Sequence, residues 1–62
     1  MLHWIKDDLG YFANQGAKQA SVWREGRFWR WSVFVGGERK CTARSRDLAE
    51  AQEYAAIMLR RF

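Results

Sequence analysis

A chain of 62 residues has room for one small domain, residues 1–62, and folding at this size buries only about 60% of the unfolded surface, so stability depends on large side chains. Four Trp, four Phe and two Tyr supply them, while a single cysteine excludes an internal disulfide and a multi-cysteine zinc site. The net charge of +4 favours a polyanionic partner, and because the chain has no long apolar run, we expect neither a membrane span nor a leading signal peptide.

Apolar residues recur every three or four positions in the first segment, at Leu2, Ile5, Leu9 and Phe12. This spacing predicts a short helix over residues 3–13. Residues 14–20 are mostly polar and include a glycine, so we expect them to form a connection that follows the helix.

Three strands are predicted next, over residues 20–24, 28–35 and 39–44, because β-branched and aromatic residues gather there and glycines separate the segments. The middle strand alternates between two kinds of side chain. One side is apolar and consists of Trp29, Trp31, Val33 and Val35. The other side mixes aromatic, basic and hydroxyl groups and consists of Phe28, Arg30, Ser32 and Phe34. We expect the tryptophan side to be buried.

The lengths of the two turns decide which residues of the outer strands join each side. A two-residue turn at Gly36 and Gly37 would direct Lys40 and every second residue after it toward the tryptophans, which would bury charge. Three-residue turns at 25–27 and 36–38 avoid this burial, and we therefore predict them.

With these turns, Trp23, Cys41 and Ala43 join the buried side of the sheet. The outer side then carries basic and aromatic residues and no acidic residue. Aromatic rings there can stack on bases while cations meet phosphates. The outer side is the predicted binding site for nucleic acid or another partner, formed by Arg24, Phe28, Arg30, Phe34, Lys40 and Arg44.

The last segment has the pattern of an amphipathic helix, with an apolar stripe at Leu48, Ala51, Ala55, Met58 and Phe62. Ser45 or Asp47 can cap its start, and Arg60 and Arg61 match the dipole at its end. The expected fold is therefore α+β: a three-stranded antiparallel meander with a short N-terminal helix and a C-terminal helix packed on one face (α-β-β-β-α).

Residue types that perform catalysis are sparse. His3 is the only histidine and lacks neighbouring metal ligands, and Gly36-Gly37 is not followed by the Lys-Ser of a phosphate-binding loop. Cys41 is expected to be a small, inert core residue in a reducing cytoplasm. The sequence therefore predicts no enzyme, no catalytic residues, no metal, no cofactor and no small-molecule substrate.

Two runs of residues resemble a known family. The first is Gly-Arg-Phe-Trp-Arg-Trp-Ser-Val-Phe-Val-Gly-Gly-Glu-Arg-Lys at 26–40, and the second is Ser-Arg-Asp-Leu-Ala-Glu-Ala at 45–51. Together, over about residues 21–59, they look like the arm-type DNA-binding domain of phage and transposon integrases. That family lays a three-stranded sheet, backed by a helix, in the major groove of double-stranded DNA. The resemblance implies that the DNA-contacting positions are Arg24, Phe28, Arg30, Lys40 and Arg44.

Two further resemblances are more general. The α-β-β-β-α order is similar to that of double-stranded RNA-binding domains, but Asp47 and Glu50 stand where that family has lysines of its phosphate clamp, so the shared order does not imply the same RNA-binding mode. In size and tryptophan content, the chain also looks like small phage proteins that block host defence or transcription complexes, including anti-CRISPR proteins.

The leading functional hypothesis is a non-enzymatic binding module from a phage or mobile element. It would engage nucleic acid, with double-stranded DNA favoured, or a nucleoprotein complex, through the basic aromatic sheet face. The alternative is a phage-encoded inhibitor of a host defence or transcription complex that binds an acidic protein surface. Both hypotheses place the protein in the cytoplasm of a bacterial cell or phage-infected host.

Overall fold

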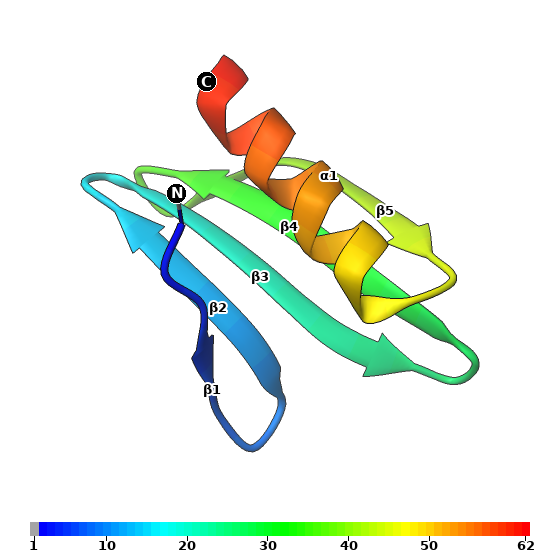
Figure 1. The fold of residues 1–62 in the computed structure, drawn as a ribbon. Helices are drawn as coiled ribbons and strands as arrows, with labels where there is room; N and C mark the ends of the chain where they lie inside the picture. Colours follow the sequence, from blue (N-terminus) through cyan, green and yellow to red (C-terminus); the bar gives the residue numbers. More distant parts are fainter. Residues whose placement is uncertain (1) are drawn as a thin grey trace.

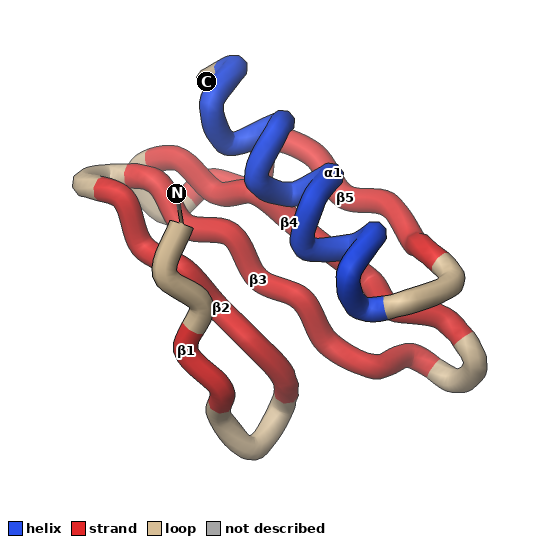
Figure 2. The backbone as a smooth tube through the Cα atoms, viewed as in Figure 1, coloured by secondary structure: helices blue, strands red, loops and turns tan. Residues whose placement is uncertain are grey.

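The sheet of this protein has five antiparallel strands, and one helix covers part of one face. A computed structural model describes residues 2–62, with the strands side by side in chain order (Figure 1). The elements are β1 (Ile5–Lys6), β2 (Gly10–Gln15), β3 (Lys18–Glu25), β4 (Phe28–Val35), β5 (Glu38–Ser45) and α1 (Leu48–Arg61). Short turns connect the strands, and α1 contacts β3, β4 and β5 (Figure 2). The expected α-β-β-β-α arrangement with a three-stranded sheet is wrong.

The N-terminal segment forms a β-hairpin where the apolar spacing predicted a helix over residues 3–13. Asp7 organises the turn, because its Oδ1 accepts hydrogen bonds from the N–H groups of Leu9 and Gly10, both at 2.9 Å. A glycine is required at position 10, since a Cβ there would collide with the carbonyl oxygen of Val22 in β3. The predicted polar connection over 14–20 is instead the end of β2, a turn and the start of β3.

The turns that join β2 to β3, β3 to β4 and β4 to β5 each contain two residues. Gly36 and Gly37 have φ values of 60° and 83°, and Gly26 has a φ of 63°. Residues other than glycine rarely adopt this left-handed backbone conformation. Such turns match the twist of the two strands that they join. The three-residue turns predicted at 25–27 and 36–38 are therefore wrong.

A β-bulge in β5 changes the alternation of its side chains. Val33 pairs with Cys41, but Phe34 pairs with Arg39, so Lys40 is an extra residue without a partner in the register. The bulge returns Cys41, and every second residue after it, to the side of the sheet that faces α1. This side is the one predicted for Cys41, although the structure reaches it by a two-residue turn and a bulge.

No bulge interrupts the pairing of β3 with β4, so the predicted faces of two β3 residues are exchanged. Arg24 pairs with Trp29, and Trp23 pairs with Arg30. Directly paired residues share a face of the sheet. Trp23, expected in the core, therefore lies on the face away from α1, and Arg24, expected outside, lies on the helix side.

The core lies between α1 and the three strands that it contacts. The helix begins where Asp47 Oδ1 accepts a hydrogen bond from the N–H of Glu50 at 2.7 Å, as predicted for a capping residue. Its stripe is confirmed in part, because Ala51 and Ala55 are fully buried with Leu59, whereas Phe62 is 46% exposed. The buried residues of the sheet that complete this cluster are Ala20, Val22, Trp31 and Val33.

Candidate interface on the open face of the sheet

The face of the sheet that α1 leaves uncovered, called the open face below, carries most of the predicted binding residues. Its members follow from the strand register, since alternate residues share a face. From β2 and β3 they include Phe12, Gln19, Ser21, Trp23 and Glu25. From β4 they are Phe28, Arg30, Ser32 and Phe34, and from β5 they include Arg39, Thr42 and Arg44. The open face thus combines four aromatic rings with three arginines.

Arg30 lies on the open face between Trp23 and Arg44 in the register, where it forms a solvent-exposed intramolecular ion pair. Its guanidinium donates to both carboxylate oxygens of Glu25, at 3.0 and 3.2 Å. This hydrogen-bonded pairing lowers the pKa of Glu25 and raises the pKa of Arg30. The sequence-based expectation of a face without any acidic residue is wrong, because the two-residue turn after β3 leaves Glu25 opposite Phe28.

Hydroxyl groups form the floor beside Arg30. The Ser32 hydroxyl donates to Thr42 Oγ1 at 2.9 Å, and the Thr42 hydroxyl donates to the carbonyl of Trp31, also at 2.9 Å. Arg30 Nη1 lies 3.4 Å from Thr42 Oγ1. Ser32 is fully buried although it points away from α1. These hydrogen bonds join the two strands beside Arg30 and help to fix the position of its guanidinium.

Two arginines of β5 retain charge for a partner. Arg44 places its guanidinium 5.2 Å from the ring centre of Phe28, and Arg39 pairs with Phe34 in the register. Neither forms a salt bridge within residues 2–62. Lys40 differs, because its Nζ lies 3.1 Å from Glu38 Oε1, so its charge is balanced locally.

Arg24 is separated from the other predicted site residues. Its Nε donates to the carbonyl of Gly26 at 2.8 Å, and its guanidinium lies 5.4 Å from the ring centre of Trp29. These contacts hold it at the end of β3 on the helix side of the sheet. The structure thus brings Phe28, Arg30, Phe34 and Arg44 together on the open face but places Arg24 elsewhere and Lys40 in the bulge.

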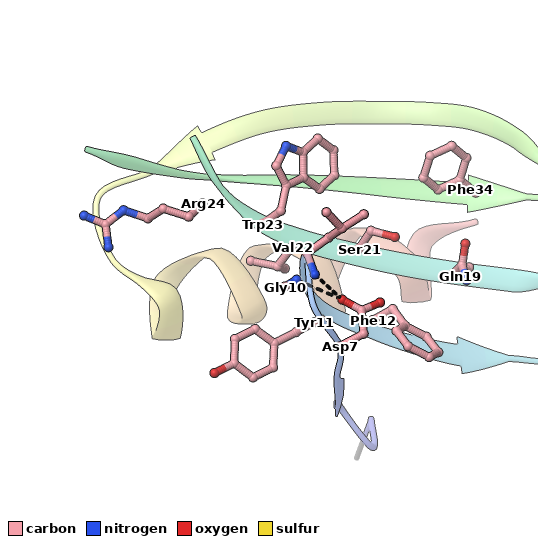
Figure 3. Close-up of a pocket in the computed structure, with 11 residues that line it drawn as sticks. Asp7, Gly10, Tyr11, Phe12, Gln19, Ser21, Val22, Trp23, Arg24 and Phe34 are labelled. Atoms are coloured by element: carbon pink, nitrogen blue, oxygen red, sulfur yellow. Dashed lines mark hydrogen bonds between the residues drawn. The ribbon is translucent and has the colours of Figure 1, made fainter. Parts of the chain in front are cut away.

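A groove of about 660 Å³ lies on the β2–β3 side of the open face. Phe12, Trp23 and Phe34 line it together with Gln19 and Ser21 (Figure 3). The three rings come from β2, β3 and β4, and each is half-buried. Ser21 pairs with Phe12 and lies two residues from Trp23. Because the Ser21 side chain is much smaller than these neighbours, it forms the bottom of the groove and the rings form its walls.

Sequence reasoning missed Phe12, Trp23 and Arg39 as members of this face. Phe12 was assigned to a helix. The predicted three-residue turns placed Trp23 and Arg39 on the side of the sheet that faces the core. One sequence signal was available for Arg39: a Gly-Gly pair is typical of a two-residue hairpin turn, which places residue 39 opposite residue 34. No comparable signal identified the β2 strand, whose Gly-Tyr-Phe-Ala-Asn-Gln run alternates only weakly.

Other reactive groups are few. Cys41 is a half-buried free thiol, and burial raises its pKa, which disfavours the reactive thiolate. Among residues 2–62, no three His, Cys, Asp or Glu side chains gather where they could hold a metal ion. In the same part of the chain, no helix has both the length and the apolar character that crossing a membrane requires.

Comparisons with models of protein families, with curated proteins and with solved structures find no match to this chain, so neither the integrase arm-type domain nor any other family is identified by them.

Proposed function

We propose that this chain is a non-enzymatic binding module that engages nucleic acid, alone or within a nucleoprotein complex, through the open face. One observation carries the proposal: Arg39 and Arg44, without a salt bridge in residues 2–62, lie beside aromatic rings on a sheet face that α1 leaves uncovered. Guanidinium groups bind phosphates, and aromatic rings stack on bases. The proposed setting is the cytoplasm of a bacterial cell or a phage-infected host, with a phage or mobile element as the source.

The open face retains cations that no carboxylate among residues 2–62 pairs with. On this face Arg30 is balanced by Glu25, whereas Arg39 and Arg44 form no salt bridge within the described part of the chain, so these two are the cations of the open face that an external phosphate can pair with. An acidic protein surface would meet the same two cations. Docking on a folded protein, however, depends on salt mainly through the association rate, whereas binding to nucleic acid releases counterions and depends on salt in the affinity itself.

The proposal is tested by titrating a fluorescein-labelled oligonucleotide of mixed sequence, as a single strand and as a duplex, at several salt concentrations. The double variant Arg39→Gln/Arg44→Gln should bind more weakly. If each arginine neutralises one phosphate, the slope of log affinity against log salt should be less steep for the double variant than for the wild type by about 1.4 to 1.8.

The matched control is Arg60→Gln/Arg61→Gln, which removes the same charge from the exposed end of α1. Its binding should remain close to that of the wild type. Equal losses in the two double variants would show that net charge alone attracts the oligonucleotide. No binding of the wild type to either form, even at low salt, would refute the proposal and favour an inhibitor that docks on an acidic protein.

A further inference from the structure

The groove on the open face has the composition of a stacking site. Phe12, Trp23 and Phe34 surround Ser21 and form part of the lining of the groove, whose volume is about 660 Å³. Pockets for small ligands span roughly 300 to 1,000 Å³ and combine apolar walls with a few polar groups. Here the polar groups include the Ser21 hydroxyl and the Gln19 amide beside the charged residues Asp7 and Arg24, and an amide both donates and accepts hydrogen bonds.

Arginine side chains lie on the open face between the groove and the β5 edge of the sheet. Phe34 belongs to the groove and pairs with Arg39, and Trp23 pairs with Arg30, which is followed in the register by Arg44. Phosphates that lead from the groove toward β5 would therefore meet Arg39 beside Phe34 or Arg44 beside Arg30. This arrangement of rings followed by cations is complementary to a base and its neighbouring phosphates.

The width of the sheet is unfavourable for a duplex. Strands β2 to β5 are separated by three spacings of about 4.8 Å, so these four strands alone are about 14 Å wide between the outer backbones, whereas the major groove is about 12 Å wide. Bases within a duplex are also stacked on one another, and their faces are not accessible to the three rings. Unpaired bases have free faces that can enter the groove.

We infer that the open face binds single-stranded nucleic acid, with one unpaired base stacked among Phe12, Trp23 and Phe34 and hydrogen-bonded by Gln19. This inference rests on the proposed function and narrows it from nucleic acid in general to single strands. The base occupies the groove, and the phosphates that follow it lie toward Arg39 and Arg44. Double-stranded DNA, which the sequence pattern favoured, does not fit this arrangement.

The test compares the labelled single strand with its duplex and uses two substitutions of one ring. Phe34→Leu keeps an apolar side chain in the groove but removes the aromatic face, and it should weaken single-strand binding about 5- to 150-fold. Phe34→Tyr retains the aromatic face and should bind like the wild type. Phe62→Ala, which removes an exposed ring at the end of α1, serves as the control and should also leave binding unchanged.

Thermal melting verifies that each variant folds, and Trp23→Leu provides a second variant at the groove if Phe34→Leu fails this check. Duplex binding as tight as single-strand binding, or full binding by the folded leucine variant, would overturn the inference while leaving the proposed function in place. No binding to either oligonucleotide would instead overturn the proposed function as well.

Discussion

Replacing Leu59 by alanine tests the contact between α1 and the sheet. Leu59 is fully buried in the cluster that contains Val22 and Val33, so removing most of its side chain should cost about 3 to 5 kcal/mol through lost burial and the cavity left behind. The backbone carbonyl of residue 59 accepts a hydrogen bond from Lys18 Nζ at 3.3 Å, and alanine retains it. The loss therefore measures side-chain packing.

A domain of this length is expected to have a free energy of unfolding of roughly 3 to 9 kcal/mol, so Leu59→Ala removes a large part of it. Urea unfolding followed by tryptophan fluorescence should show a midpoint lower by about 3 to 5 M, given an m value near 1 kcal/mol/M. Leu9→Ala is the matched control, since Leu9 is 84% exposed, and it should change stability by less than about 0.5 kcal/mol. Equal midpoints for the two variants would refute the described packing of α1.

Two further predictions address the N-terminal hairpin and the ion pair of the open face. Gly10→Ala should destabilise the protein by about 1 to 3 kcal/mol in the same urea assay, because the added Cβ meets the backbone of β3; an unchanged midpoint would contradict the close approach of β2. The pKa of Glu25 lies below its ordinary value of 4.5, so the stability gained from its ionisation is complete above that pH and is lost as the pH falls through the lower folded value. Melting temperatures measured across this acid range should therefore decline less for Glu25→Gln than for the wild type, and parallel profiles would contradict the pairing with Arg30.

The elements that the sequence predicted correctly are those in which several local signals agree. β4 combines β-branched and aromatic residues with strict alternation, and its observed bounds, Phe28–Val35, match the prediction. For α1, the cap at Asp47, the alanine stripe and the basic last turn all indicate a helix that starts near residue 48. Agreement among independent signals leaves few alternative structures.

The N-terminal error arose because a single signal was available. The apolar spacing of residues 2–12 suits a helix, but the turn at Asp7 and the close approach of Gly10 to β3 stabilise a hairpin. Packing against a distant strand cannot be deduced from spacing within one segment. The same limit affected Trp23 and Arg24, whose faces depend on turn length and on whether a bulge follows.

The bulge at Lys40 also bears on how the protein behaves at high concentration. Unpaired strand edges can recruit further strands from other molecules, which leads to aggregation. At one edge, β5 is charged along its first residues and irregular at Lys40, and at the other edge β1 is only two residues long. Neither edge is both long and regular, so the register that orients the open face also discourages edge-to-edge growth of the sheet into fibrils.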